Sequence, residues 1–414
     1  MNATKKIKSR IYPEIFCLLP FIIYLPFIFM GYGSDVDTYR VLDTWSNFLA
    51  TNDYIPSRLP GYVIHELGTY LITRLDGSVL SNAVSLLFSI LTCIFLVKII
   101  KRFSLPVESV LLIILNPVYL VHSTSTTDFV WALCFFCAGI YLLLDRKIIG
   151  AAIALGFSSA IRLSYGLLIF VVLILFLFVY IRKDRKIINS FLVAIGLIFL
   201  INFLAYYLPV DFTEWRLKSF FHVSTGDQTL WSPLMRVGRW AYKNLLFWGI
   251  PTAFILIGLI LNKAGTIKSQ WRSQNQVILL CALIILFFAE CTFFLYPIEI
   301  EYLLPILPFT AIVLAFMYKE KRTVLILLSI LMLLNGLYII QLARPDVANQ
   351  ASSAKLDISI TEGYLLSDIS HRILLRDCDS RECYSAPISQ PILEWKTSNL
   401  QYMDIKSKWQ HFLF

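Results

Sequence analysis

The sequence predicts an all-α polytopic membrane protein with about eleven transmembrane helices. Of the 414 residues, 58% are hydrophobic and only 15% are charged, whereas roughly a quarter of the residues in a soluble domain are charged. The mean hydropathy is +0.71. A soluble protein of this length could not bury so much apolar surface. The bilayer must therefore be the solvent for most of the chain.

A transmembrane helix needs roughly 20 mostly apolar residues, and runs of this kind recur along the chain. The run that begins at Ile11 follows a basic cluster, but it is too long for a signal-peptide core and no small-residue cleavage site follows it. We therefore expect an uncleaved first span. The expected spans lie near residues 11–32, 78–99, 107–122, 128–145, 148–162, 164–181, 187–209, 243–262, 275–297, 301–318 and 322–341.

The segments between these spans alternate in charge, which predicts their orientation. If the N-terminus is cytoplasmic, every cytoplasmic segment carries Lys or Arg, whereas most Asp and Glu residues fall on the opposite face. Cytoplasmic loops of membrane proteins are enriched in basic residues. If one span were missing, the alternation of basic and acidic segments would break. The alternation therefore supports the number of spans and an extracytoplasmic C-terminus. The uncleaved chain and its periplasm-like outer face indicate a bacterial inner (plasma) membrane, with the endoplasmic reticulum as the alternative.

The formal net charge of +9 lies mostly in these short basic clusters. The sequence contains no Gly-rich phosphate loop, zinc-finger spacing or RNA-binding aromatic motif. Nucleic acid is therefore not expected as a partner.

Composition divides the chain into two parts. Residues 1–341 form the expected transmembrane domain, and residues 342–414 form a small, more polar extracytoplasmic segment to which we assign no function. In this segment, Cys378 and Cys383 are disulfide candidates, because thiols in an oxidising compartment can pair.

Two outer segments, 33–77 and 210–242, are long and suit the membrane surface. In 38–51, apolar residues recur at helical spacing with polar residues between them, which predicts an amphipathic helix on the bilayer. Residues 61–75 repeat this pattern more weakly. The second segment mixes aromatic and basic residues, as the headgroup layer favours: Trp215, Trp231, Trp240, Arg216, Lys218, Arg236 and Arg239.

The strongest candidate for chemistry is the segment from Ser34 to Arg40, which carries Asp35 and Asp37 directly after the first span. Carboxylates there can act as a general base or hold a divalent cation. The alternative is local, with Ser34 capping the next helix and Asp37 in its first turn. The two interpretations are compatible, because a capping network can hold a catalytic Asp in place.

Other charged residues on the outer face are candidates for substrate binding. Arg58 lies in a turn fixed by two prolines and a glycine, where its planar guanidinium could hold a donor phosphate or meet lipid phosphates. His65 and Glu66, shortly after it, fit an ordinary helix better than a site.

Further along, Asp128 begins a span and could stabilise a helix N-terminus. Arg162 lies within an apolar run, where a charge usually has a partner or a function because desolvation is costly. Glu301 and Tyr302 occupy the last outer turn.

The acidic first outer loop, the surface helices after it and about eleven spans resemble the GT-C superfamily of membrane glycosyltransferases. The run from Asp35 to Tyr39 is similar to the Asp-Glu-x-x-Tyr element of the branch that holds aminoarabinose transferases and protein O-mannosyltransferases. Asp128 stands where that group often has an acidic residue, and Arg162 looks like its Arg-Pro position with leucine for proline. The run from Glu301 through Tyr302 to Pro305 resembles its late Arg-Tyr-Leu-Leu-Pro element.

The sequence departs from this pattern at two positions. The second acidic residue lies one position later than in the family's pair, and Glu301 replaces an arginine. Arg58, Arg236 and Arg239 are the candidates to supply the donor-phosphate contact in its place.

The resemblance implies sugar transfer from a polyprenyl-phosphate donor in the bilayer to a glycan, lipid or protein acceptor on the extracytoplasmic face. Asp35 would be the base, by its spacing to Tyr39. Asp37 would orient it or bind a divalent cation, the one candidate cofactor. Arg58 and Arg162 would hold the donor phosphate.

A transporter or flippase of a lipid-linked sugar is the main alternative. Such proteins usually show internal repeats and charged or broken helices at mid-membrane, whereas most charges here lie at the outer rim and the sequence shows no repeat. A membrane acyltransferase would need an intramembrane histidine, and His122 is the only one near a span end.

Overall fold

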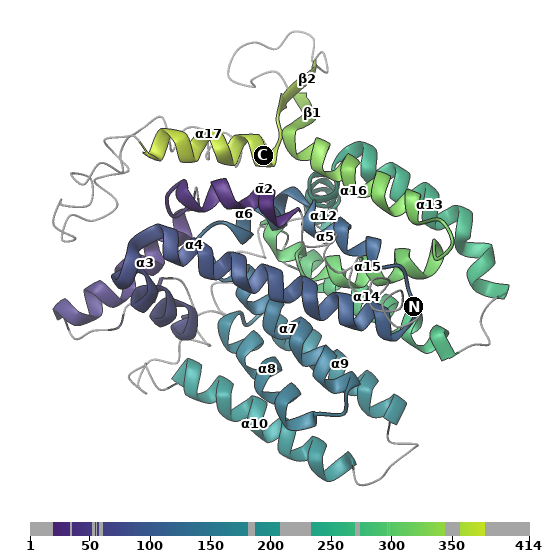
Figure 1. Cartoon of the computed structure of the whole chain (residues 1–414), viewed down its shortest axis with the longest axis horizontal. Helices are drawn as coiled ribbons and strands as arrows, with labels where there is room; N and C mark the ends of the chain where they lie inside the picture. The colour runs from purple at the N-terminus through teal and green to yellow at the C-terminus, as the bar shows by residue number, and fades with distance from the viewer. Residues whose placement is uncertain are drawn as a thin grey trace, which may run out of the picture.

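The computed structural model describes residues 20–33, 35–51, 54, 56–57, 61–180, 187–207, 233–269, 274–295, 297, 299–343 and 357–376. This part of the chain is a bundle of helices with one two-stranded hairpin (Figure 1). Most of the expected first span lies outside the described residues, as do Arg58, Cys378, Cys383 and most of the 210–242 segment.

The bounds of the helices follow the apolar runs closely in most of the described chain. In order they are α2 (Phe21–Tyr24), η1 (Leu25–Phe29), α3 (Val36–Thr51), α4 (Val63–Arg102), η2 (Val107–Val110), α5 (Leu111–Ile114), α6 (Pro117–Ser123), α7 (Phe129–Leu144), α8 (Ile148–Ile161), α9 (Tyr165–Tyr180), α10 (Ile187–Tyr207), α12 (Pro233–Trp248), α13 (Ile250–Ser269), α14 (Gln274–Leu295), η4 (Ile300–Leu303), α15 (Ile306–Met317), α16 (Arg322–Leu337) and α17 (Tyr364–Arg376), where η marks a 3-10 helix.

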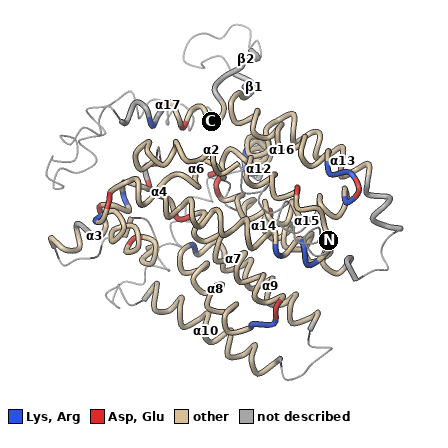
Figure 2. Tube along the Cα trace, in the orientation of Figure 1, with Lys and Arg blue, Asp and Glu red and all other residues tan. Residues whose placement is uncertain are grey.

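Three described helices are long and apolar enough to cross a membrane: α4, α10 and α14. A fourth candidate is the bent pair of α12 and α13. Further apolar helices, α7, α8, α9, α15 and α16, are shorter. Large apolar side chains such as Phe199, Leu261 and Phe287 are 64–72% exposed on α10, α13 and α14. Figure 2 shows long stretches of these helices without charge, so their surfaces suit a hydrocarbon solvent.

Helix α4 contains the predicted boundary between a surface helix and a span. Asp76 and Gly77 have non-helical backbone angles, and Gly77 has φ +57°, a left-handed conformation that glycine adopts easily. The break separates residues 63–75 from 78–102. The expected helices at 61–75 and 78–99 are therefore confirmed, and so is the amphipathic helix predicted at 38–51, which is α3.

The prediction of one helix over 107–122 was wrong. Here the chain forms η2, α5 and α6 in succession. The break comes at Asn116, whose side chain caps α6 by accepting the Tyr119 amide at 3.0 Å, and Pro117 fits the first turn of the new helix. This segment is almost wholly buried in the bundle.

The span expected at 243–262 falls on a sharply bent pair of helices. Helices α12 and α13 meet at Gly249 with a bend of 96°. Gly249 has φ +74°, and a Cβ there would lie 2.5 Å from the Cβ of Asn335 in α16. The bend therefore depends on a residue without a side chain.

Replacing Gly249 by alanine should destabilise the protein by about 1–3 kcal/mol through backbone strain, with the clash against Asn335 adding to the loss. Gly258→Ala in α13 is the matched control, since a Cβ there meets nothing within 4 Å. It should be neutral or stabilise by about 0.5–1 kcal/mol. Unfolding in detergent measures both, and equal midpoints for the two variants would contradict the proposed cause of the bend.

The last apolar run, predicted at 322–341, ends as a helix at Leu337 and continues as strand β1 (Tyr338–Ala343). Strand β2 (Asp357–Glu362) pairs with it antiparallel, Tyr338 opposite Glu362. The polar segment then forms α17, which packs against α6 and α16. The start of the C-terminal segment is thus folded onto the bundle.

Candidate functional site

The acidic segment after the first span begins α3. The Oδ1 of Asp35 accepts the backbone amide of Asp37 at 2.9 Å, and Asp37 pairs with Arg40 at 3.1 Å. The helix-capping acceptor is therefore Asp35 itself. Ser34 lies outside the described residues.

This segment is fastened against the turn before α7. Gly33 has φ +118° and a Cβ there would lie 2.7 Å from the Cβ of Ser125, so the two backbones touch. The amide of Thr126 donates to the Tyr32 carbonyl at 2.8 Å, and the Thr38 hydroxyl donates to the Thr126 carbonyl at 3.0 Å. These contacts fix where the two aspartates sit relative to α7.

Asp128 and Arg162 form a buried ion pair at 2.6 Å, with Asp128 fully buried and Arg162 1% exposed. The Arg162 guanidinium carbon also lies 3.5 Å from the ring centre of Phe129 and 4.9 Å from that of Tyr302. Arg162 therefore has the charged partner that its place in an apolar run demands. The pair joins the start of α7 to the end of α8 and to the last outer turn.

Glu299 and Glu301 lie in that last outer turn, and the charges of both aspartates act on Glu299. Burial, together with the charges of Glu301, Asp35 and Asp37, raises the pKa of Glu299 to about 8. These four side chains are called the carboxylate cluster below. With this pKa, the Glu299 carboxyl is mostly protonated at neutral pH.

Glu301, in contrast, is ionised, although burial alone would raise its pKa. Hydrogen bonding and the charge of His122, together with the Tyr364 hydroxyl, lower the pKa of Glu301 to about 2. The Oε1 of Glu301 lies 3.5 Å from His122 Nε2, and His122 Nδ1 lies 3.1 Å from the Thr127 hydroxyl. Glu299 is thus neutral and Glu301 ionised. Two carboxyl groups whose pKa values are pushed apart in this way are typical of acid–base sites.

Glu299→Gln should alter how stability depends on pH. The pKa of Glu299 in the folded protein exceeds its ordinary value, so its contribution to stability is full below about pH 4.5 and is lost as pH rises through about 8. Gln cannot ionise, so the variant should become more stable than wild type at about pH 9, with the gap closing by about pH 5.

The exposed Glu320 provides the control for this comparison. Glu320→Gln makes the same change in charge and should leave the pH profile parallel to that of wild type. Melting temperatures in detergent measure all three proteins. A Glu299→Gln profile parallel to wild type would show that Glu299 ionises normally.

The basic candidates on α12 lie near this cluster. Helix α12 packs against η4, which carries Glu301. Arg236 and Arg239 are half-buried on α12. Lys243, one turn beyond Arg239, is the α12 base whose charge acts on Glu301 and Glu299. The sequence did not single out Lys243.

Sequence reasoning also missed His122 and Tyr364 as members of the site. His122 was noted only as a histidine near a span end. Tyr364 lies in the C-terminal segment, and no spacing in the sequence links it to Glu301.

Glu66, which was expected to be an ordinary helix residue, is fully buried. Its carboxylate accepts the Tyr54 hydroxyl, and it accepts the amide and hydroxyl of Ser57 at 3.0 Å and 2.6 Å. Its role is therefore to hold the turn that leads to Arg58.

Among the described residues, no three His, Cys, Asp or Glu side chains are grouped as a metal ion requires. A divalent cation at Asp35 and Asp37 would need further ligands. Mg²⁺ commonly binds one or two carboxylates together with water and substrate phosphate, which this pair could provide with a phosphorylated donor.

A scan against protein-family models found no match to this chain, and searches of the curated proteins and of the solved structures found none either. Function has to be argued from the geometry and chemistry of the site.

Proposed function

We propose that this chain is a polytopic membrane glycosyltransferase with about eleven spans, which moves a sugar from a polyprenyl-phosphate donor to an acceptor on the extracytoplasmic face. One observation carries the proposal. The charges of Asp35 and Asp37, in the first outer segment, act on Glu299 in the last outer turn, which also carries Glu301. Two segments far apart in the sequence would thus contribute acidic residues to one site.

The helices that border the acidic residues support a lipid-linked substrate. Asp35 and Asp37 begin α3, an amphipathic helix, and the basic helix α12 packs beside Glu301. Amphipathic helices lie in the plane of the headgroups. A donor whose lipid tail stays in the bilayer would present its phosphate and sugar at this depth.

In the proposed reaction, Asp35 takes the proton of the acceptor hydroxyl while the hydroxyl oxygen bonds to the anomeric carbon of the sugar. The bond from that carbon to the donor phosphate breaks, and polyprenyl phosphate leaves as an anion. Asp35 suits the role because its position is fixed by the Asp37 amide and by the contacts of Gly33. Asp37 would orient it or share a divalent cation with it.

The departing phosphate needs positive charge. Arg162 is buried and bound to Asp128, so we assign it a positioning role, in which it holds Phe129 and Tyr302. The half-buried bases of α12 are better placed for the phosphate: Arg236, Arg239 and Lys243.

A vesicle assay distinguishes this proposal from a transporter or flippase. The purified protein is reconstituted in liposomes that contain a radiolabelled polyprenyl-phosphate sugar and candidate acceptors. Sugar transfer would yield free polyprenyl phosphate and a new labelled product. Movement of the intact labelled lipid between leaflets without any new product would favour the transporter and overturn the proposal.

A further inference from the structure

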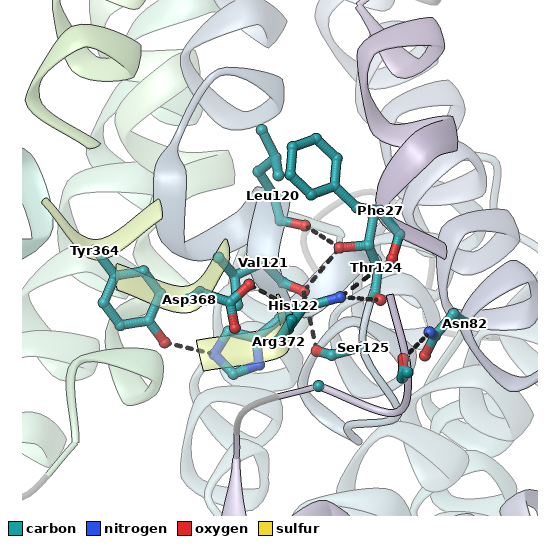
Figure 3. Close-up of polar contacts among 12 residues, drawn as sticks. Phe27, Asn82, Leu120, Val121, His122, Thr124, Ser125, Tyr364, Asp368 and Arg372 are labelled. Carbon is teal, nitrogen blue, oxygen red and sulfur yellow. Dashed lines mark hydrogen bonds and ion pairs between the residues drawn. The ribbon is translucent and has the colours of Figure 1, made fainter. Parts of the chain in front are cut away.

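Helix α17 is fastened to the bundle by a buried arginine (Figure 3). Arg372 is 1% exposed, pairs with Asp368 at 2.7 Å and donates to the carbonyls of Thr124 at 2.8 Å and Val121 at 3.2 Å. These carbonyls belong to the C-terminal end of α6, where the helix dipole favours a cation. Arg372 therefore binds the C-terminal segment to the element that carries His122.

The start of α17 is held just as closely. The amide of Gly363 donates to the Leu337 carbonyl at 2.7 Å, and a Cβ on Gly363 would clash with the Gly336 carbonyl. A Cβ on Gly336 would in turn clash with Pro117 of α6. The backbone before Tyr364 is therefore set by direct contact with α16, and α16 by direct contact with α6.

This docking brings Tyr364 to the carboxylate cluster. Its hydroxyl donates to Glu301 Oε1 at 2.7 Å and lies 3.2 Å from His122 Nε2. Figure 3 shows the Tyr364 hydroxyl directed at the His122 ring. Burial and the Glu301 charge raise the pKa of Tyr364 well above its usual value, so the phenol stays protonated and acts as a donor.

The charged and titratable groups that act on Glu301 come from several elements. They are His122 on α6, Tyr364 on α17, Glu299 beside it and Lys243 on α12. Tyr364 is the neutral donor in this set, and its hydroxyl stabilises the ionised Glu301 carboxylate.

We propose that Tyr364 is a positioning residue of the candidate site, whose hydroxyl acts with His122 to hold Glu301 ionised and oriented. The C-terminal helix would then complete the site rather than form an independent domain. The effect on catalysis rests on the proposed function, whereas the effect on ionisation rests only on the contacts of Tyr364.

The first test measures stability against pH for Tyr364→Phe and Tyr119→Phe. Tyr119 is a buried tyrosine whose hydroxyl donates to the Ser89 carbonyl at 2.9 Å, an acceptor that does not titrate. The stability that Glu301 contributes is present above about pH 4.5 and is lost as pH falls toward about 2. Tyr364→Phe should have a lower free energy of unfolding than wild type at about pH 6, and this difference should shrink as the pH falls to about 3.

The deficit of Tyr119→Phe should stay constant over this range. A constant deficit for Tyr364→Phe would overturn the inference, since a merely structural ring contact does not depend on pH. If Tyr364→Phe does not fold, Glu301→Gln decides the question. It should flatten the acid side of the wild-type stability curve, and an unchanged acid side would overturn the inference.

The second test measures cleavage of the polyprenyl-phosphate sugar. A hydrogen bond to a charged group contributes about 1.5–3 kcal/mol, so Tyr364→Phe should lower the rate by about 10- to 100-fold, with the pH–rate profile displaced on its acid side. A Tyr364→Phe rate and profile equal to wild type would refute the catalytic role. Should wild type cleave no donor, the proposed function fails, while the stability curves still decide whether Tyr364 holds Glu301 ionised.

Discussion

Asp35→Asn lowers the rate of donor cleavage by about 10²- to 10⁴-fold, the usual contribution of a positioned general base. The amide of Asn cannot accept the proton of the acceptor hydroxyl. Asn caps a helix about as well as Asp, so it keeps the contact to the Asp37 amide that begins α3. The loss should therefore appear in the rate and not in the melting temperature.

Asp43→Asn on the same helix is the matched control. Asp43 is a half-buried acid two turns further along α3, and the substitution makes the same change in charge. It should retain close to wild-type activity. Full activity in Asp35→Asn would remove Asp35 from the mechanism, and equal losses in both variants would assign the effect to the net charge of α3.

The second large effect is expected at the ion pair between Asp128 and Arg162. Asp128→Leu leaves the Arg162 guanidinium buried without its counter-charge, which should cost about 3–5 kcal/mol. The double variant Asp128→Leu/Arg162→Met should recover most of this loss, because apolar residues of similar volume often replace a buried pair without penalty. Unfolding in detergent measures both.

The pair of Glu108 and Arg322, 3.1 Å apart with Glu108 14% and Arg322 67% exposed, provides the more solvated comparison. Its disruption by Glu108→Gln should cost at most about 1 kcal/mol. If Asp128→Leu cost no more than Glu108→Gln, or if the double variant were no more stable than the single one, the interpretation of Arg162 as a desolvated positioning residue would be contradicted.

Local patterns in the sequence predicted much of the described architecture. The break between a surface helix and a span at Gly77 follows from a glycine at the end of a weakly amphipathic stretch. The amphipathic pattern of 38–51 likewise predicted α3. Both depend on neighbouring residues alone, which spacing can reveal.

The breaks inside apolar runs could not be located in this way. Gly249 lies in a continuous apolar stretch, and the close approach of Asn335 that makes its conformation necessary comes from a distant helix. Asn116 and Pro117 break the helix inside the run at 107–122, where the apolar pattern alone predicted one helix. An uninterrupted run indicates burial or membrane insertion, not straightness.

The candidate site was predicted in part. Asp35, Asp37, Asp128, Arg162 and Glu301 were named from short motifs. The structure pairs Asp128 with Arg162 and binds the start of α3 to the turn before Asp128. His122 and Tyr364 were missed because their importance arises from contacts between distant segments. The hydroxyl of Tyr364 meets His122 only because Arg372 fastens α17 to α6.

The most direct measurement is the release of polyprenyl phosphate from a panel of radiolabelled polyprenyl-phosphate sugars by the purified protein in detergent, with wild type beside Asp35→Asn. Detergent removes the two compartments that transport requires, so only covalent chemistry gives a signal. Release by wild type that falls by at least about 100-fold in Asp35→Asn is the predicted result. The account would be contradicted if folded wild type released nothing from any donor and bound none of them, or if Asp35→Asn released polyprenyl phosphate as fast as wild type.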